Sequence, residues 1–263
     1  MAKSLNAGRA AENGVMAATL AATGFTASAR VFEDPMGFFA AACENRYKRD
    51  LLQFGSPWFL KEPGIAIKRY PCAGVMHPML DTLLALLERQ PVCPEAVDHL
   101  RIHLHPDAAR PLVYNRPERG LEGKFSLPYT AAVALVDRSV TLRHYTDKQV
   151  RNPRIQALMS RVEMVSDPHL NLPGSEDTLA KVELVLTSGV RYDEDASGGS
   201  IKRPDRPSLE GKFRECAEYG RIGKGKHLQG VIDALWSLES VNSVASWMRL
   251  LGTGERQPKN GRK

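Results

Sequence analysis

Residues 99–105 alternate between polar and apolar side chains, and no other stretch restricts the fold as strongly. Leu100, Ile102 and Leu104 occupy every second position, and the positions between them hold three histidines and Arg101. Because successive side chains of a β-strand point to opposite faces, this alternation predicts a strand with one buried face. The fold therefore includes a sheet as well as helices.

Helical spacing of apolar residues predicts most of the other elements. An alanine-rich helix is expected at 4–23, followed by Gly24 as a stop, and a second at 34–43 opens with Asp34 and Pro35 as cap and first residue. Ser126 is placed to cap a helix at 127–137. Further helices are predicted to begin at His77, Thr146 and Asn152, and a last helical region covers 228–251.

Strands are predicted at 65–68, 162–165, 180–186 and 190–193, and the last two would be joined by a tight turn. Residues 194–208 contain a Ser-Gly-Gly-Ser run, which is typical of a mobile connection. The chain would thus have helices at both ends around a central segment of mixed α and β structure.

The pentapeptide Leu-Glu-Gly-Lys-Phe occurs twice, at 121–125 and at 209–213. The first copy is followed by Ser-Leu-Pro-Tyr and a long apolar helix, whereas Arg-Glu-Cys-Ala follows the second, and the preceding residues also differ. A duplicated unit would keep some similarity in its flanks. We therefore interpret the repeat as a coincidence of two segment boundaries.

Half of the formal net charge of +6 comes from the C-terminus, because residues 252–263 alone carry four basic side chains and one Glu. Outside this tail, Lys and Arg do not gather into a run with interleaved aromatic residues, as a nucleic-acid-binding surface would require. We predict that the protein has no nucleic-acid partner and that 252–263 form a disordered basic tail.

The cysteines are far apart and form no Cys-x-x-Cys pair, which argues against a zinc ribbon or a thioredoxin-type motif and fits a reducing compartment. They are Cys43, Cys72, Cys93 and Cys216. Arg9 and Glu12 make the N-terminal stretch too polar for a secretory signal, and no run of about 18 apolar residues occurs. We therefore predict a cytoplasmic protein with no membrane partner.

Three histidines of the alternating stretch, His99, His103 and His105, share one strand face and could together reach a metal ion. Histidines on the polar face of a strand are more often simple surface residues. We predict that the protein has no metal site.

The segment 67–78 places Lys68, Arg69 and His77 around an irregular turn between a predicted strand and a helix. Loops held by rigid elements often carry substrate contacts. A substrate with several carboxylates would need such cations for binding and for stabilising an enolate-like transition state. A solvated surface loop is an equally good interpretation of these residues alone.

Several motifs occur in the same order as in one enzyme family. They are Lys-Ser-Leu-Asn-Ala-Gly-Arg-Ala-Ala (3–11), Gly-Phe-Thr (24–26), Lys-Arg-Tyr-Pro (68–71), His-Pro (77–78), Lys-Phe-Ser-Leu-Pro-Tyr (124–129), the 146–162 stretch and Lys-Phe-Arg-Glu-Cys-Ala (212–217). With them the chain resembles the MmgE/PrpD family from residue 3 to about 251. Members of this family include 2-methylcitrate dehydratase, cis-aconitate decarboxylase and iminodisuccinate epimerase.

The resemblance implies an α+β fold in which all-helical domain pieces at both ends flank an inserted α+β lid domain. Residues 1–62 would be a helical-domain segment, 63–204 the lid domain, 205–251 the C-terminal helical return and 252–263 the tail. It also implies that the N-terminal half of the helical domain is missing. The first helix begins abruptly, which fits this expectation.

The resemblance also implies the candidate site. The catalytic residues would be Lys3, Lys68, His77 and Tyr114, and the substrate-binding residues would be Lys3, Lys68, Arg69, Lys124 and Ser126. Asn6 stands where the family motif usually has a histidine, and the family's acid/base histidines of the N-terminal half have no counterpart. The family chemistry uses no metal and no organic cofactor, so we expect neither.

The function implied by the resemblance is that of a lyase, either a dehydratase or a decarboxylase, acting on a small di- or tricarboxylate such as 2-methylcitrate or cis-aconitate. It would move a proton next to a carboxylate. The alternatives are an epimerase of the same family, a non-catalytic fragment, or one subunit of a split enzyme. Besides the small carboxylate, the expected partner is a second copy in a homodimer or a separate chain carrying the N-terminal half. We expect the chain alone to be inactive.

Overall fold

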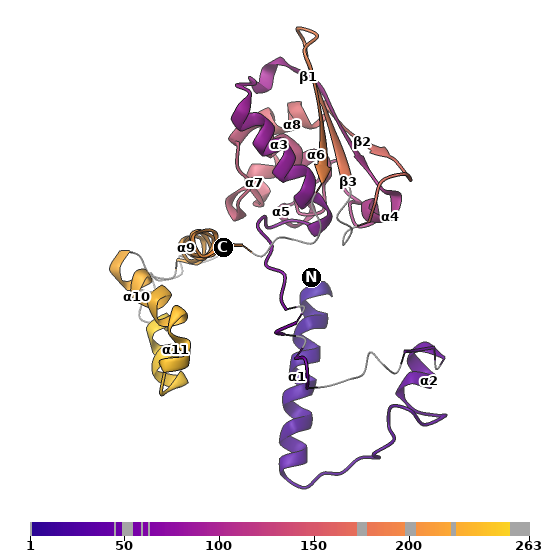
Figure 1. Ribbon diagram of the computed structural model, residues 1–263, viewed down its shortest axis with the longest axis vertical. Coiled ribbons are helices and arrows are strands. Elements are labelled where there is room, and N and C mark those ends of the chain that lie inside the picture. Colours follow the sequence, from indigo (N-terminus) through magenta and orange to yellow (C-terminus); the bar gives the residue numbers. More distant parts are fainter. Residues whose placement is uncertain are drawn as a thin grey trace. The chain divides into compact units, whose positions relative to one another are not determined.

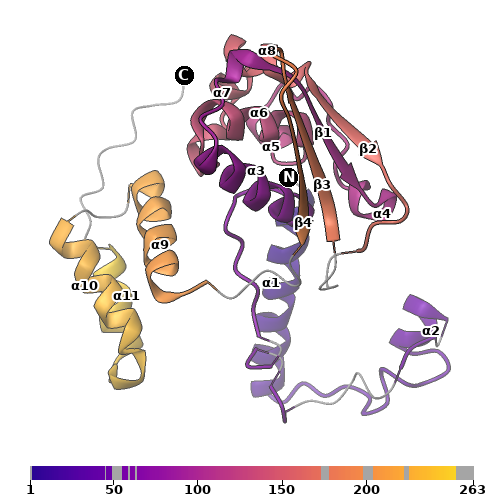
Figure 2. The same ribbon diagram turned by 45° about the horizontal axis from the view of Figure 1, so that its top comes forward.

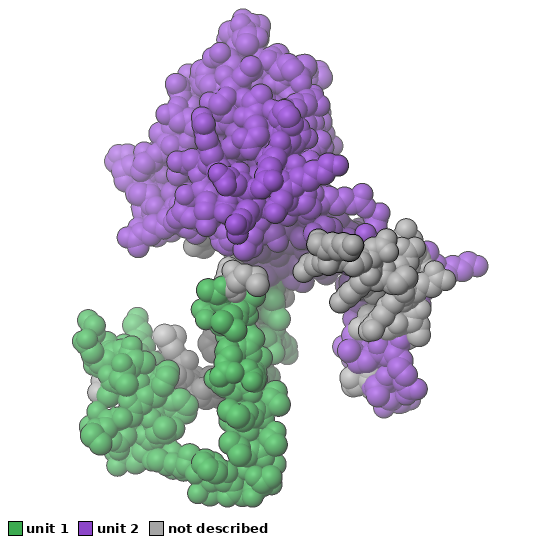
Figure 3. Space-filling model, turned by 180° about the vertical axis from the view of Figure 1, so that it is seen from behind, with its two compact units in different colours: residues 1–65 green, residues 66–263 purple. Residues whose placement is uncertain are grey.

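The computed structural model describes residues 2–44, 46–48, 55–58, 60–62, 64–172, 178–197, 204–221 and 225–252. The chain forms two compact units, residues 1–65 and residues 66–263, which Figure 3 shows in different colours. The first unit is helical, and the second combines helices with a four-stranded sheet. The fold is therefore α+β, as the sequence predicts.

The first unit contains α1 (Ala2–Ala22) and α2 (Phe38–Cys43). α1 confirms the alanine-rich helix, and Gly24 follows its end at a φ of 90°. None of the described side chains in this unit is buried. Leu5 and Val15 on α1, for example, are 63% and 70% exposed. The hydrophobic core of the described residues therefore lies in the second unit.

α2 begins at Phe38 rather than next to Asp34, so the predicted cap is wrong. The Oδ1 atom of Asp34 accepts a hydrogen bond from Met36 N at 3.1 Å and forms a turn before the helix, and Gly37 is the N-cap residue. Asp and Pro favour turns as much as helix starts, so the local pattern does not distinguish the two.

The sheet of the second unit has the strand order β2-β1-β3-β4 (Figure 1). Its strands are β1 (Val97–Leu104), β2 (Val162–Ser166), β3 (Thr178–Leu186) and β4 (Arg191–Ser197). β1 runs parallel to β2 and antiparallel to β3, and β3 and β4 form the predicted hairpin. Leu100, Ile102 and Leu104 are at most 1% exposed, which confirms the predicted buried face of β1.

The strand predicted at 65–68 is wrong, because residues 64–68 are an irregular segment. Ile65 and Ile67 are exposed, so no burial of apolar surface holds this run against the sheet. The Lys68 side chain instead bends back to its own loop, where Nζ donates a hydrogen bond to the Cys72 carbonyl at 3.0 Å.

Two helices, α3 (His77–Arg89) and α6 (Leu127–Asp137), pack against the sheet, and α8 (Pro153–Met159) packs against α6 (Figures 1 and 2). α6 is the central one, since every residue from Leu127 to Leu135 is buried. The predicted caps of α6 and α8 are confirmed. Ser126 Oγ accepts from Tyr129 N at 3.2 Å, and Asn152 Oδ1 accepts from Arg154 N at 3.0 Å.

Short elements connect these layers. They are the helices α4 (Pro106–Ala109), α5 (Gly120–Gly123) and α7 (Asp147–Val150), and the single 3₁₀ turns η2 (Gly74–Met76), η3 (Pro94–Ala96) and η4 (Leu142–His144). Thr146 caps α7 as predicted, because its hydroxyl accepts a hydrogen bond from Gln149 N at 3.3 Å.

The C-terminal part of the described chain is helical: α9 (Arg206–Gly220), α10 (Gly225–Trp236), η5 (Leu238–Ser240) and α11 (Val244–Gly252). The predicted helical region at 228–251 is thus two helices with a turn between them. The mobile connection predicted at 194–208 is wrong at both ends, because β4 continues to Ser197 and α9 begins at Arg206, where the Asp205 side chain caps it. Residues 198–203 and most of the predicted tail lie outside the described residues.

Helix α9 contacts the turn η4 and the loop that precedes α3, both of which belong to the same unit. The Glu215 carboxylate accepts a hydrogen bond from Leu142 N at 3.1 Å, and Arg143 forms an ion pair with Glu218. The Lys212 ammonium donates to the Arg69 carbonyl at 3.3 Å. Side chains far apart in sequence therefore meet between α9 and the loop that precedes α3.

A close approach at Gly120 tests this packing. A Cβ atom at Gly120 would lie 2.2 Å from the Tyr145 carbonyl oxygen, whereas one at Gly211 on α9 would meet nothing within 4 Å. We expect Gly120→Ala to lower the free energy of unfolding by about 2 kcal/mol, as overpacking does. Gly211→Ala should be neutral or raise it by up to about 1 kcal/mol. Urea denaturation of both variants measures the difference, and equal stabilities would contradict the described packing.

Candidate functional site

Most of the predicted site residues of the second unit lie on or beside the loop that precedes α3. Ala73 N donates a hydrogen bond to the Lys124 carbonyl at 3.0 Å, which attaches this loop to the segment just before α6. With Lys68 bonded to the Cys72 carbonyl, the chain turns sharply and enters η2 and then α3. The turn brings Lys68 and His77 close to Lys124, although they come from different segments.

Arg69 and Tyr70 in this loop both contact Asp81 on α3. The Arg69 guanidinium forms an ion pair with the Asp81 carboxylate, and the Tyr70 hydroxyl donates to Asp81 Oδ1 at 2.7 Å. Burial and the contact with Asp81 raise the pKa of Tyr70, so its hydroxyl stays protonated. Arg69 therefore already has a carboxylate partner, whereas Lys68 bonds to a neutral carbonyl.

His77 is 2% exposed, and neither ring nitrogen has a hydrogen-bond partner of good geometry. Its ring meets the Tyr70 ring edge-on, with 5.3 Å between centroids. Burial lowers the pKa of His77 to about 4, and the positive charge of Lys68 adds to the shift, while the Tyr70 backbone opposes it slightly. The imidazole is therefore neutral at pH 7 and retains an unused donor and acceptor.

Cys72 is buried among cations. The ammonium groups of Lys68, Lys124 and Lys212 and a hydrogen bond with Tyr145 all favour its thiolate, but burial outweighs them and raises the pKa of the thiol to about 12. Lys124 Nζ also lies 6.0 Å from the centre of the Tyr145 ring. Three lysines from three segments thus surround a group that carries no negative charge.

The structure brings together Lys68, Arg69, His77 and Lys124 of the predicted site. Ser126 is fully buried, and its hydroxyl oxygen caps α6, which is a structural role. Tyr114 is 39% exposed, and its backbone N–H donates to the Phe125 carbonyl at 3.4 Å, so its backbone lies beside the Lys124 segment.

Lys3 lies on α1 in the other unit, and its side chain is outside the described residues. Lys212 is the residue that the sequence analysis did not propose for the site. The signal was present in its Lys-Phe-Arg-Glu-Cys-Ala motif and in the second Leu-Glu-Gly-Lys-Phe copy.

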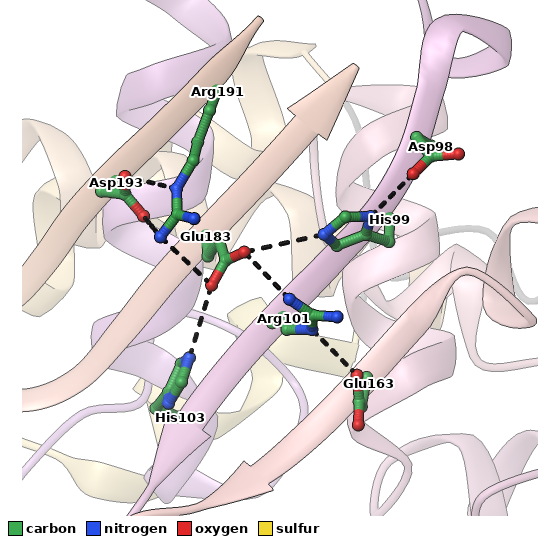
Figure 4. A network of polar contacts seen from close by, with 8 residues as sticks. All are labelled: Asp98, His99, Arg101, His103, Glu163, Glu183, Arg191 and Asp193. Carbon is green, nitrogen blue, oxygen red and sulfur yellow. Dashed lines mark hydrogen bonds and ion pairs between the residues drawn. The ribbon is translucent and has the colours of Figure 1, made fainter. Parts of the chain in front are cut away.

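The histidine face of β1 is part of a charge network around Glu183 on β3 (Figure 4). Glu183 Oε1 lies 3.2 Å from Arg101 Nη1 and 3.6 Å from His99 Nε2. Its Oε2 atom lies 3.5 Å from Arg191 Nη2 and 3.9 Å from His103 Nε2. Asp98, the neighbour of His99 in the sequence, lies 2.8 Å from His99 Nδ1, and strand pairing adds Glu183 from β3. Within the described ranges no group of three or more His, Cys, Asp or Glu side chains is arranged to hold a metal ion.

Comparison with known proteins assigns both parts of the chain. Residues 70–238 match the MmgE/PrpD C-terminal domain, and residues 1–50 match the MmgE/PrpD N-terminal domain. The chain belongs to the MmgE/PrpD family. The C-terminal match includes His77, Lys124 and Lys212, and it begins two residues after Lys68.

Three similar proteins are named cis-aconitate decarboxylase. The mouse protein (Mus musculus) is 28% identical over 262 residues, an alignment that covers 95% of this chain and 52% of the relative. The human protein (Homo sapiens) is 28% identical over 257 residues with the same coverage, and that of Aspergillus terreus is 23% identical over 277 residues, covering 98% and 56%. The chain spans about half the length of the curated relatives it matches.

None of the described helices is both long enough and apolar enough to cross a membrane.

The neutral state of His77 makes stability depend on pH. Its folded pKa of about 4 lies below the unfolded value of 6.5, so protons bind the unfolded chain more tightly. The contribution of the neutral imidazole to stability is complete above pH 6.5 and is lost as pH falls towards 4. We expect wild type to lose up to about 3 kcal/mol of stability relative to His77→Gln as the pH falls from 6.5 to 4. Urea denaturation at several pH values measures this, and parallel profiles for the two proteins would contradict the buried neutral imidazole.

Proposed function

We propose that this chain supplies the carboxylate-binding lid of an MmgE/PrpD lyase that acts on a small di- or tricarboxylate, such as cis-aconitate or 2-methylcitrate. One observation carries the proposal. Lys68 Nζ donates to the Cys72 carbonyl, the Lys124 carbonyl accepts from Ala73 N and Lys212 Nζ donates to the Arg69 carbonyl, so three lysines lie beside the loop that carries Cys72. Cys72 and the nearby His77 are both buried and neutral at pH 7. A carboxylate ligand would provide the negative charge that this cluster lacks.

The expected chemistry follows from these charges. Removal of a proton next to a carboxylate, or loss of carbon dioxide, places negative charge on the substrate as an enolate-like species. Fixed cations stabilise such charge best when they are in place before the reaction. Lys68 Nζ donates to the Cys72 carbonyl and Lys124 Nζ lies near the Tyr145 ring, so both ammonium groups are already positioned before a substrate binds.

His77 suits an orienting role better than that of the general base. A general base works best when its pKa lies near the working pH, and a pKa of about 4 makes the imidazole a weak base at pH 7. Its free nitrogen atoms can still donate or accept a hydrogen bond with a substrate hydroxyl or carboxyl group. Proton transfer would then need another group, which a second copy or a separate chain of the family's N-terminal half would provide.

The names of the relatives favour decarboxylation among the reactions of the family. An epimerase of the same family would use the same carboxylate contacts and remains the alternative within the enzyme class. Outside it, the alternative is a non-catalytic fragment or one subunit of a split enzyme. We further propose that the chain associates either with a second copy or with a separate chain of the family's N-terminal half. The exposed apolar side chains of α1 support such an association.

Calorimetric titration of the purified chain with cis-aconitate and with 2-methylcitrate tests this proposal. We expect saturable binding that Lys68→Gln weakens about tenfold, since a hydrogen bond to a charged group contributes roughly 1.5–3 kcal/mol. Lys181→Gln on β3 removes the same charge from an exposed position outside the lysine cluster and should leave binding unchanged. Equal affinities of wild type and Lys68→Gln would contradict the proposed site.

Turnover is followed in the same samples. We expect binding without decarboxylation or dehydration, because His77 is a weak base at neutral pH. Turnover that Lys68→Ala abolishes would show instead that this chain needs no separate chain of the family's N-terminal half.

A further inference from the structure

The two Leu-Glu-Gly-Lys-Phe copies have different local structures. In the first copy Gly123 is buried, and a Cβ atom there would lie 3.0 Å from the Tyr129 ring. In the second copy, on α9, a Cβ atom at Gly211 would meet nothing within 4 Å. Both lysine residues nevertheless contact the loop that precedes α3, because the Lys124 carbonyl accepts a hydrogen bond from Ala73 N and Lys212 Nζ donates one to the Arg69 carbonyl. Two lysines that are 88 positions apart in the sequence therefore lie beside the same loop.

A cavity of about 250 Å³ lies between α9 and the loop that precedes α3. Residues that line it include Lys68, Arg69, Ser208, Gly211, Lys212 and Glu215. The volume is below the roughly 300–1,000 Å³ of pockets for drug-sized ligands, which suits a small acid. Among the described residues of this lining Glu215 is the one carboxylate, and its Oε1 atom already accepts a hydrogen bond from Leu142 N. Because Arg69 is paired with Asp81, the positive charge of this lining comes from Lys68 and Lys212 against Glu215.

The two lysines of the cavity are held in place by backbone carbonyls. Lys68 Nζ donates to the Cys72 carbonyl at 3.0 Å, and Lys212 Nζ donates to the Arg69 carbonyl at 3.3 Å. An ammonium group has three N–H donors, so each lysine retains donors for a ligand. Contacts of Glu215 and Glu218 with η4 anchor α9 and keep Lys212 at this position. Such preorganisation lowers the entropic cost of binding.

We infer that Lys212 binds the second carboxylate of a small acid whose first carboxylate is bound at Lys68, so that the placement of α9 selects acids with two or three carboxylates over acids with one. This inference rests on the proposed function, since it requires a carboxylate at Lys68. It adds a residue that sets specificity and that belongs to a different segment from the predicted site.

The test compares propionate, succinate and tricarballylate as probes of wild type and Lys212→Gln by calorimetry. We expect wild type to bind the di- and tricarboxylate more tightly than propionate. Lys212→Gln should weaken the binding of succinate and tricarballylate about tenfold and that of propionate less than twofold, because only the longer acids reach α9. Lys212→Arg keeps the positive charge and should restore most of the difference. Lys226→Gln removes an exposed charge from α10 and should bind all three probes as wild type does.

A second variant fills the cavity without removing a charge. Gly211→Leu places a side chain where a Cβ atom meets open space, and Leu is a good helix former, so the variant should fold. We expect it to weaken tricarballylate about tenfold with an unchanged or higher midpoint of unfolding. Unchanged binding of tricarballylate by Gly211→Leu would place its site elsewhere and overturn the inference.

The failures are distinguishable. If wild type binds none of the three acids, both the proposed function and the role of Lys212 are wrong. If Lys68→Gln weakens binding but Lys212→Gln has no effect, or weakens propionate as much as succinate, the proposed function stands and the role of Lys212 is overturned.

Discussion

The burial of α6 determines where the candidate site can form. A helix that is apolar on all sides must be covered on all sides, and here the sheet and the helices α3 and α8 provide that cover. The Ser126 cap fixes the N-terminal end of α6, and with it the Lys124 segment just before the cap. Because Ala73 N bonds to the Lys124 carbonyl, the loop that carries Lys68 takes its position from this buried helix as well.

The electrostatics follow from the same burial. Cys72 and His77 are desolvated strongly enough to remain neutral, even though nearby lysines would stabilise a thiolate at Cys72. Among these cations Arg69 pairs with the Asp81 carboxylate, whereas the Lys68 and Lys212 ammonium groups donate to backbone carbonyls. The contrast with the polar face of the sheet is clear. There Glu183 lies among two arginines and two histidines, and each charge has a counterpart (Figure 4).

Local patterns predict local structure here and miss what tertiary pairing creates. Helix caps at Ser126, Thr146 and Asn152 and the buried face of β1 could be read from a few neighbouring residues, because a cap or an alternation needs no distant partner. The strand expected at 65–68 had suitable residues but no burial to hold it. The neighbours of Glu183 and Lys212 could not be predicted from sequence, since strand register and the docking of α9 decide them, although Lys212 lies in one of the motifs that carry the family resemblance.

The most direct test of the account is a crystal structure of the chain with tricarballylate bound. The account predicts carboxylate oxygens about 2.7–3.2 Å from Lys68 Nζ and from Lys212 Nζ, the normal range for N–H···O hydrogen bonds. Helix α9 should keep its contacts with η4 in that complex. A structure in which the acid binds elsewhere, or in which one carboxylate contacts Lys68 while Lys212 remains bonded only to the Arg69 carbonyl, would contradict it.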